Sequence, residues 1–109
     1  MTKFKHGDYE ILAETWETKN NWGHKAMLYK GDEFITQYKA TYYNRTWESY
    51  QYRSVVIGVL SKYMNDRAET LFLRYKAKNN KNRLTQDVKS AIMKGDDIIQ
   101  DIKSWLKEL

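Results

Sequence analysis

Two short segments hold most of the residue types that could recognise a partner. Residues 42–55, YYNRTWESYQYRSV, contain five Tyr or Trp and two Arg among fourteen positions. Residues 74–83, RYKAKNNKNR, contain five Lys or Arg and no acid. Tyr, Trp and Arg contribute much of the energy at protein interfaces, and the same types stack on bases and pair with phosphates. Both segments therefore predict binding.

The aromatic segment has more ring area than a turn needs, so some of its rings are expected at the surface. A stripe through Tyr52, Val56 and Leu60 recurs at helical spacing and predicts the core side of a helix. Tyr50 lies off that stripe. The partner-binding residues predicted on this basis are Tyr43, Arg45, Tyr50 and Arg53. The alternative is that Trp47 and two of the Tyr rings close the core over a sheet, since buried aromatics dominate small cores.

The basic segment accounts for most of the formal charge of +5. A local excess of cations attracts phosphates or an acidic protein face. The nucleic-acid-binding residues predicted here are Arg74, Lys76, Lys78, Lys81 and Arg83. The alternative is a solvated loop, because basic residues are common at helix ends.

Catalytic and metal-binding chemistry finds little support. The chain has no Cys and only two His, His6 and His24, whereas common zinc sites need three or four N or S ligands. Its five Gly are scattered, so no phosphate-binding loop is present. Asp96, Asp97 and Asp101 could hold Mg²⁺ in a nuclease, but acids are favoured at a helix start in any protein. We expect no enzyme, no metal and no cofactor.

The hydrophobic pattern predicts an α+β fold in one domain, residues 1–109, with a sheet over about 9–43 and helices over about 47–109. Strands near 9–18, 24–29 and 33–43 form an antiparallel meander, with turns at 19–23 and Gly31-Asp32. Two or three helices pack on one face of this sheet.

The first helix is expected from about Trp47, capped by Thr46, to Met64. Asn65-Asp66 then breaks it, with Asp66 and Glu69 resembling a capping box. Residues 66–78 fit both a helix and a strand, and their composition favours a helix. A last helix begins at Thr85, and Gly95-Asp96 kinks or splits it.

The meander, the YYNRTWESYQYRSV segment and the helical end together resemble small proteins encoded by phages, plasmids and integrated elements of low-GC Gram-positive bacteria. The resemblance covers Trp22 to Tyr63 and is carried by a set of polar and aromatic residues: Asn44, Arg45, Thr46, Trp47, Glu48 and Tyr52. It supplies no catalytic residues.

Some small mobile-element proteins of this size are anti-CRISPR inhibitors. The resemblance therefore implies a non-enzymatic inhibitor of a host defence nuclease, most sharply a type II RNA-guided nuclease or its ribonucleoprotein complex. The alternative is a small nucleic-acid-binding accessory protein of a phage or plasmid. A phosphodiester-cleaving enzyme using the Asp residues is a third class. No apolar run reaches the roughly 18 residues of a membrane span, so a cytoplasmic location in the host bacterial cell is expected.

Overall fold

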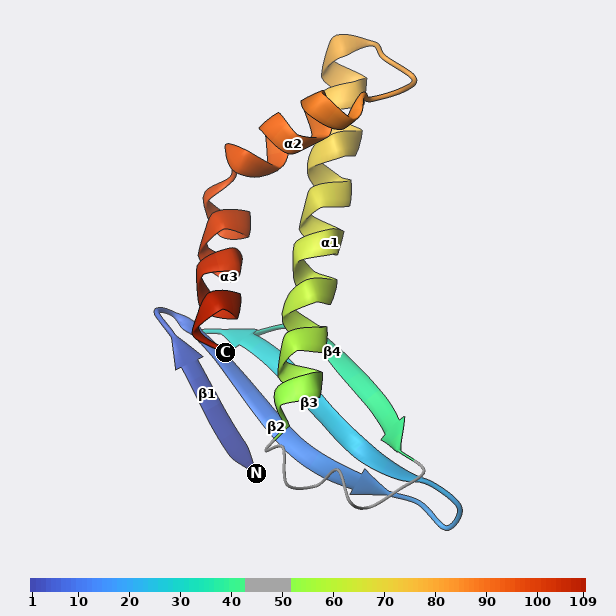
Figure 1. The fold of residues 1–109 in the computed structure, drawn as a ribbon, viewed down its shortest axis with the longest axis vertical. Helices are drawn as coiled ribbons and strands as arrows, with labels where there is room; N and C mark the ends of the chain where they lie inside the picture. Colours follow the sequence, from blue (N-terminus) through green and yellow to red (C-terminus); the bar gives the residue numbers. More distant parts are fainter. Residues whose placement is uncertain (43–51) are drawn as a thin grey trace. The chain divides into compact units, whose positions relative to one another are not determined.

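The computed structural model describes residues 1–42 and 52–109, which form four strands and three helices (Figure 1). The elements are β1 (Thr2–His6), β2 (Tyr9–Glu17), β3 (Trp22–Lys30), β4 (Glu33–Tyr42), α1 (Arg53–Asn79), α2 (Gln86–Lys94) and α3 (Asp97–Glu108). They divide into two compact units, residues 1–62 with Leu109 (the sheet unit) and residues 63–108 (the helical unit). The predicted α+β class is confirmed, and the single domain stays a prediction. None of the helices in the described residues is long and apolar enough to cross a membrane.

The sheet is an antiparallel meander in the order β1-β2-β3-β4. Two-residue turns at Gly7-Asp8 and Gly31-Asp32 close the outer hairpins, and both glycines have a left-handed φ, +58° and +60°. Such φ values are what a tight hairpin turn requires, and glycine adopts them without a steric penalty. The three predicted strands are present. The prediction missed β1, and β3 begins at Trp22, inside the predicted turn.

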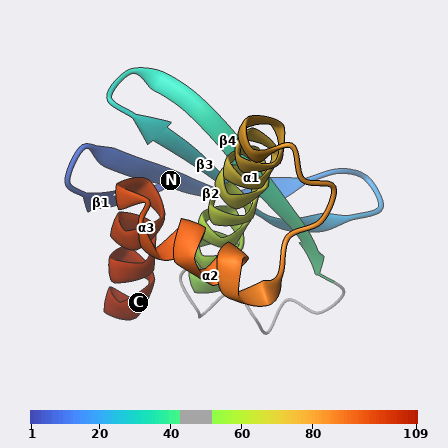
Figure 2. The ribbon, with the colours of Figure 1, turned by 90° about the horizontal axis from the view of Figure 1, so that it is seen from above.

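The core of the sheet unit lies between one face of the sheet and the start of α1 (Figures 1 and 2). Alternate residues of β2 and β3 point to this inner face, and those in the middle of the strands are completely buried. The first turns of α1 add the other half of the core. The fully buried side chains are Ile11, Ala13, Ala26, Leu28, Val55, Val56, Val59 and Leu60. Each large apolar residue stabilises the fold by about 1.5–3 kcal/mol through its removal from water.

Gly58 explains how closely α1 approaches β4. A Cβ at this position would lie 2.5 Å from the ring of Tyr38, so a larger residue would displace the ring or the helix. One turn later, Lys62 Nζ donates a hydrogen bond of 2.9 Å to the carbonyl of Gln37. The helix thus satisfies a backbone acceptor on an edge strand, which would otherwise be open to pairing with another chain.

The start of α1 differs from the prediction. Residues 47–51 of the expected helix lie outside the described residues. Tyr52 has a φ of +67°, outside the right-handed helical region, so the helix begins at Arg53 and a continuous helix from Trp47 is wrong.

The predicted break at Asn65-Asp66 is also wrong, because α1 runs on to Asn79. Asn and Asp each cost less than about 0.7 kcal/mol relative to Ala inside a helix, and both side chains here are exposed. Strong helix formers on either side outweigh that cost. The helical interpretation of residues 66–78 is therefore confirmed.

The helical unit contains the rest of α1 with α2 and α3. Gly95 ends α2, so the predicted last helix is split. Buried residues of this unit are Ala68, Ile99, Ile102 and Trp105.

Candidate nucleic-acid interface

The five predicted nucleic-acid-binding residues lie at one end of the helical unit. Arg74, Lys76 and Lys78 stand on the last turns of α1, and Lys81 and Arg83 follow in the loop before α2. We call these five residues the basic tip. Lys76 is half-buried and the other four are exposed. The structure therefore brings together a set that the sequence presented as a contiguous run.

The end of α1 holds the loop against the helix. Asn80 takes a left-handed φ of +51°, and the N–H of Lys81 then donates a 3.1 Å hydrogen bond to the carbonyl of Lys76. The Asn79 side-chain amide also donates to the Tyr75 carbonyl at 2.9 Å. This is the geometry of a left-handed helix C-cap, for which Asn is the usual substitute for Gly. The cap places Lys81 beside the last helical turn.

The other end of the loop is fixed by the start of α2. Thr85 has an extended backbone, and its hydroxyl accepts a 3.3 Å hydrogen bond from the N–H of Val88, so Thr85 is the N-cap of α2 and the predicted helix start is confirmed. Lys89 on α2 places Nζ 5.6 Å from the centre of the Phe72 ring on α1. A cation over an aromatic ring is attracted to its negative face. The loop that carries Lys81 and Arg83 is thus anchored on both sides.

The region around the tip is strongly positive. Residues 70–95 contain seven Lys or Arg and one acid, Asp87. Within residues 1–42 and 52–109, none of the five tip side chains makes an ion pair. The partial negative charge at a helix C-terminus favours Lys76 and Lys78, but it weakens beyond the last turn and does not account for the whole run. The arrangement is suited to holding an anion.

Asp96, one of the three acidic residues near Gly95, has a structural role. Arg67 binds Asp96 with two bonds, Nε to Oδ1 at 3.4 Å and Nη2 to Oδ2 at 2.9 Å. Oδ1 also accepts the N–H of Ile99 at 3.0 Å, so Asp96 caps α3. Burial raises the pKa of this carboxyl, but the hydrogen bonds from Arg67 and Ile99 and the charge of Arg67 outweigh burial and lower the pKa overall. Among the described residues, no group of three or more His, Asp or Glu is placed to hold a metal ion.

The predicted partner-binding set is described only in part. Tyr43, Arg45 and Tyr50 lie outside the described residues. Arg53, the first residue of α1, is exposed, and its Nε donates a 3.1 Å hydrogen bond to the carbonyl of Leu109.

Tyr52, predicted for the core, is half-buried against the inner face of the sheet. Its hydroxyl is 3.3 Å from Thr15 Oγ1, and its ring centre is 4.6 Å from that of His24. His24 is buried, with 4% of its surface exposed. Strand alternation turns His24 inward, where its ring also meets Trp22 at 5.8 Å. The signal available in the sequence was this alternation, in phase with Ala26 and Leu28.

Sequence reasoning also missed the contact between Trp16 and Lys39, whose Nζ is 4.8 Å from the indole centre. These residues come from β2 and β4 and meet across β3, on the face of the sheet opposite α1.

Comparisons with protein-family models, with curated proteins and with solved structures found no match to this chain. Function is therefore inferred from side-chain chemistry and geometry.

Proposed function

We propose that this chain is a non-enzymatic binding protein that holds the phosphate backbone of nucleic acid on its basic tip. The observation that carries the proposal is the placement of five cations on one capped helix end and its anchored loop, without acid partners in the described residues. Cations that neutralise phosphates release condensed counterions, which supplies most of the affinity in sequence-independent binding.

The residue types of the tip suit the backbone better than the bases. Lysine presents a mobile point charge, and the guanidinium of arginine can pair with two phosphate oxygens at once. Contacts of this kind position a nucleic acid without reading its sequence. We therefore expect the tip to bind duplexes of different sequence with similar affinity.

The test is the salt dependence of duplex binding by the variant K78A/K81A/R83A. Each lost phosphate contact lowers the slope of log affinity against log salt by about 0.9, so three lost contacts lower it by nearly three. The variant K19A/K103A/K107A is the matched control, because it removes the same charge from exposed positions outside the tip.

The two variants separate a site from bulk charge. The proposal predicts a flattened slope for the tip variant and a smaller change for the control. Equal changes of slope in both variants, or an unchanged slope in the tip variant, would mean that the basic residues are merely solvated and form no binding site.

We further propose, as a second candidate, that the nucleic acid belongs to a host defence nuclease of the type II RNA-guided class, which the chain inhibits. Two observations favour it beside the resemblance of residues 22–63. Arg53, which belongs to the aromatic segment, is exposed at the start of α1. A ribonucleoprotein also presents the phosphates that the basic tip suits.

Cleavage of target DNA by such a nuclease, with and without the protein, tests this candidate. Full inhibition is expected from the unaltered chain. Arg45→Ala and Tyr50→Ala should each cost about 2 kcal/mol or more of binding to the nuclease if they are interface anchors. Undiminished cleavage at saturating protein would reject the inhibitor while leaving nucleic-acid binding by the tip intact.

A further inference from the structure

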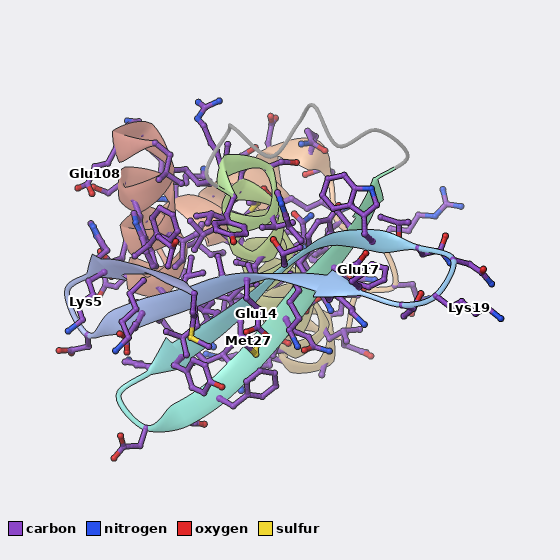
Figure 3. The ribbon with its side chains drawn as sticks, turned by 90° about the horizontal axis from the view of Figure 1, so that it is seen from below. Lys5, Glu14, Glu17, Lys19, Met27 and Glu108 are labelled. Atoms are coloured by element: carbon purple, nitrogen blue, oxygen red, sulfur yellow. The ribbon has the colours of Figure 1, made fainter. Side chains whose placement is uncertain are left out.

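The second face of the sheet, opposite α1, has a composition unlike that of a solvated surface. We call it the outer face. Side chains that alternate with the buried residues of β2 and β3 point to it, among them Leu12, Trp16, Met27 and Tyr29. Figure 3 labels Glu14 and Met27 near the middle of the sheet and Lys5 on its β1 side. No other described element of the sheet unit covers this face.

One aromatic group of the outer face is fixed in place. The Trp16 indole Nε1 donates a 3.2 Å hydrogen bond to the carbonyl of His24. Lys39 reaches the same ring from β4, across the position of Gly23 on β3. A Cβ at Gly23 would collide with the carbonyl oxygen of Ala40 on β4, so this position admits only glycine. Lys39 Nζ therefore lies over the fixed ring before any ligand arrives.

A second aromatic group lies further along the strands. Tyr29 and Phe34 face each other in register, with ring centres 5.6 Å apart and planes at 70°. The irregularity at Leu28/Tyr29 shifts the register so that Phe34 stands opposite Tyr29. Phe34 is 50% exposed. Trp16 pairs with Gly23, six positions from Tyr29, so the two aromatic groups are about 20 Å apart along the sheet at roughly 3.3 Å per residue.

The charges between the aromatic groups favour an anion. Glu10 and Glu14 are each beside a lysine, Lys3 Nζ at 3.9 Å and Lys25 Nζ at 2.9 Å. Lys25 and Lys39 are directly opposite each other in the β3–β4 register. Like charges in that position destabilise a sheet. Glu14 compensates the charge of Lys25, which leaves the charge of Lys39 to attract an anion.

We propose that the outer face binds single-stranded nucleic acid, with an unpaired base stacked on the Tyr29–Phe34 pair and a phosphate held by Lys39, which lies over the Trp16 ring. Aromatic rings on a sheet stack on bases of any sequence, and neighbouring lysines follow the backbone. Protein partners fit this face less well, because the centres of protein interfaces are depleted in Lys and Glu. The inference deepens the proposed function, since it names the class of nucleic acid, but it concerns a separate surface.

The experiment compares three probes of one length: an oligo-dT strand, an oligo-U strand and a DNA duplex. The variant F34A/K39Q removes one stacking ring and one cation from the outer face. The control L73A/K103Q removes an exposed leucine and an exposed lysine from the helical unit. Thermal melts establish that both variants are folded.

The outer-face variant should bind both single strands about tenfold more weakly and the duplex unchanged, since removing a stacking ring costs this much or more. The control should match the unaltered chain on all three probes. Tighter binding of oligo-U than of oligo-dT would place a contact on the ribose 2′-hydroxyl, and equal binding would mean recognition by stacking alone; either accords with the proposal if the outer-face variant weakens both.

Unchanged single-strand affinity in F34A/K39Q overturns the proposal, as does an equal loss for strand and duplex. If the same variant instead loses a protein partner while keeping its single strands, the outer face is a protein interface. The tip variant K78A/K81A/R83A distinguishes the two sites, because failure of the tip appears as an unchanged salt slope on the duplex.

Discussion

The basic tip and the outer face differ in how their residues come together. The tip is nearly contiguous in sequence, and a helix cap and a short loop keep its cations adjacent. The outer face draws side chains from all four strands, and they meet only when the strands pair in this register. A charge-based surface can thus be encoded locally, whereas an aromatic surface on a sheet depends on the whole sheet unit. Variants that separate fold, tip and outer face test this difference.

The largest effect is expected from the residues that set the two sheet faces apart. Leu28 and Phe34 lie on the inner and the outer face. Leu28→Ala leaves a cavity in a fully buried core and should lower the free energy of unfolding by about 2–5 kcal/mol. Phe34→Ala should lower it by about 1 kcal/mol or less. Denaturant titrations measure both, and equal losses would mean that the outer face serves the fold alone.

The Arg67–Asp96 pair should contribute the next largest effect, in the helical unit. Asn keeps the helix-capping acceptor, so Asp96→Asn removes mainly the ion pair and should lower stability by about 2 kcal/mol at pH 7. Asp97→Asn, at an exposed neighbour, should cost less than about 1 kcal/mol.

The same pair predicts a pH dependence. Because the folded-state pKa of Asp96 is lowered, its contribution is complete above the unfolded pKa of about 4 and is lost as pH falls through the lower, folded value. Melts from pH 7 down to pH 2 should show the difference between the unaltered chain and Asp96→Asn narrowing below about pH 4. A constant difference over that range would mean that Asp96 does not titrate as the geometry implies.

The N-cap that anchors the tip loop should have a smaller effect. Thr85→Ala leaves the Val88 N–H without its acceptor and should lower stability by about 1 kcal/mol, while Thr85→Ser should restore it. Hydrogen exchange at Val88 reports the loss locally. Equal exchange in all three proteins would show that the cap does not hold the loop.

The smallest effect on the fold is expected at the tip itself. Lys78→Ala should change stability by less than about 0.5 kcal/mol, because the side chain is exposed. It should nevertheless lower the salt slope of duplex binding by about 0.9. A melting shift as large as that of Thr85→Ala would assign Lys78 to the helix C-terminus and not to a ligand.

The sequence predicted the features that depend on neighbours along the chain. The Thr85 cap, the split at Gly95 and the stripe through Val56 and Leu60 follow from local chemistry and helical spacing. The strand β1 could also have been predicted, because Gly7-Asp8 repeats the Gly31-Asp32 turn. It was missed because the strand is only five residues long and mostly polar.

The remaining features depend on tertiary contacts. Tyr52 takes a left-handed φ that a bulky residue adopts only where its surroundings require it, and its ring lies beside His24. The meeting of Trp16 with Lys39 depends on strand register, and that of Tyr29 with Phe34 depends also on the irregularity at Leu28/Tyr29 in the β3–β4 pairing. No spacing along the chain encodes either contact.

Backbone and indole NMR shifts during a nucleic-acid titration test the central claim, phosphate binding by the basic tip, most directly. With duplex DNA, amide shifts are predicted to concentrate at residues 74–83 and to disappear at high salt. With oligo-dT, the Trp16 indole and the amides of Tyr29 and Phe34 should shift as well. Shifts spread over α3, or none at residues 74–83 with either probe, would contradict the account.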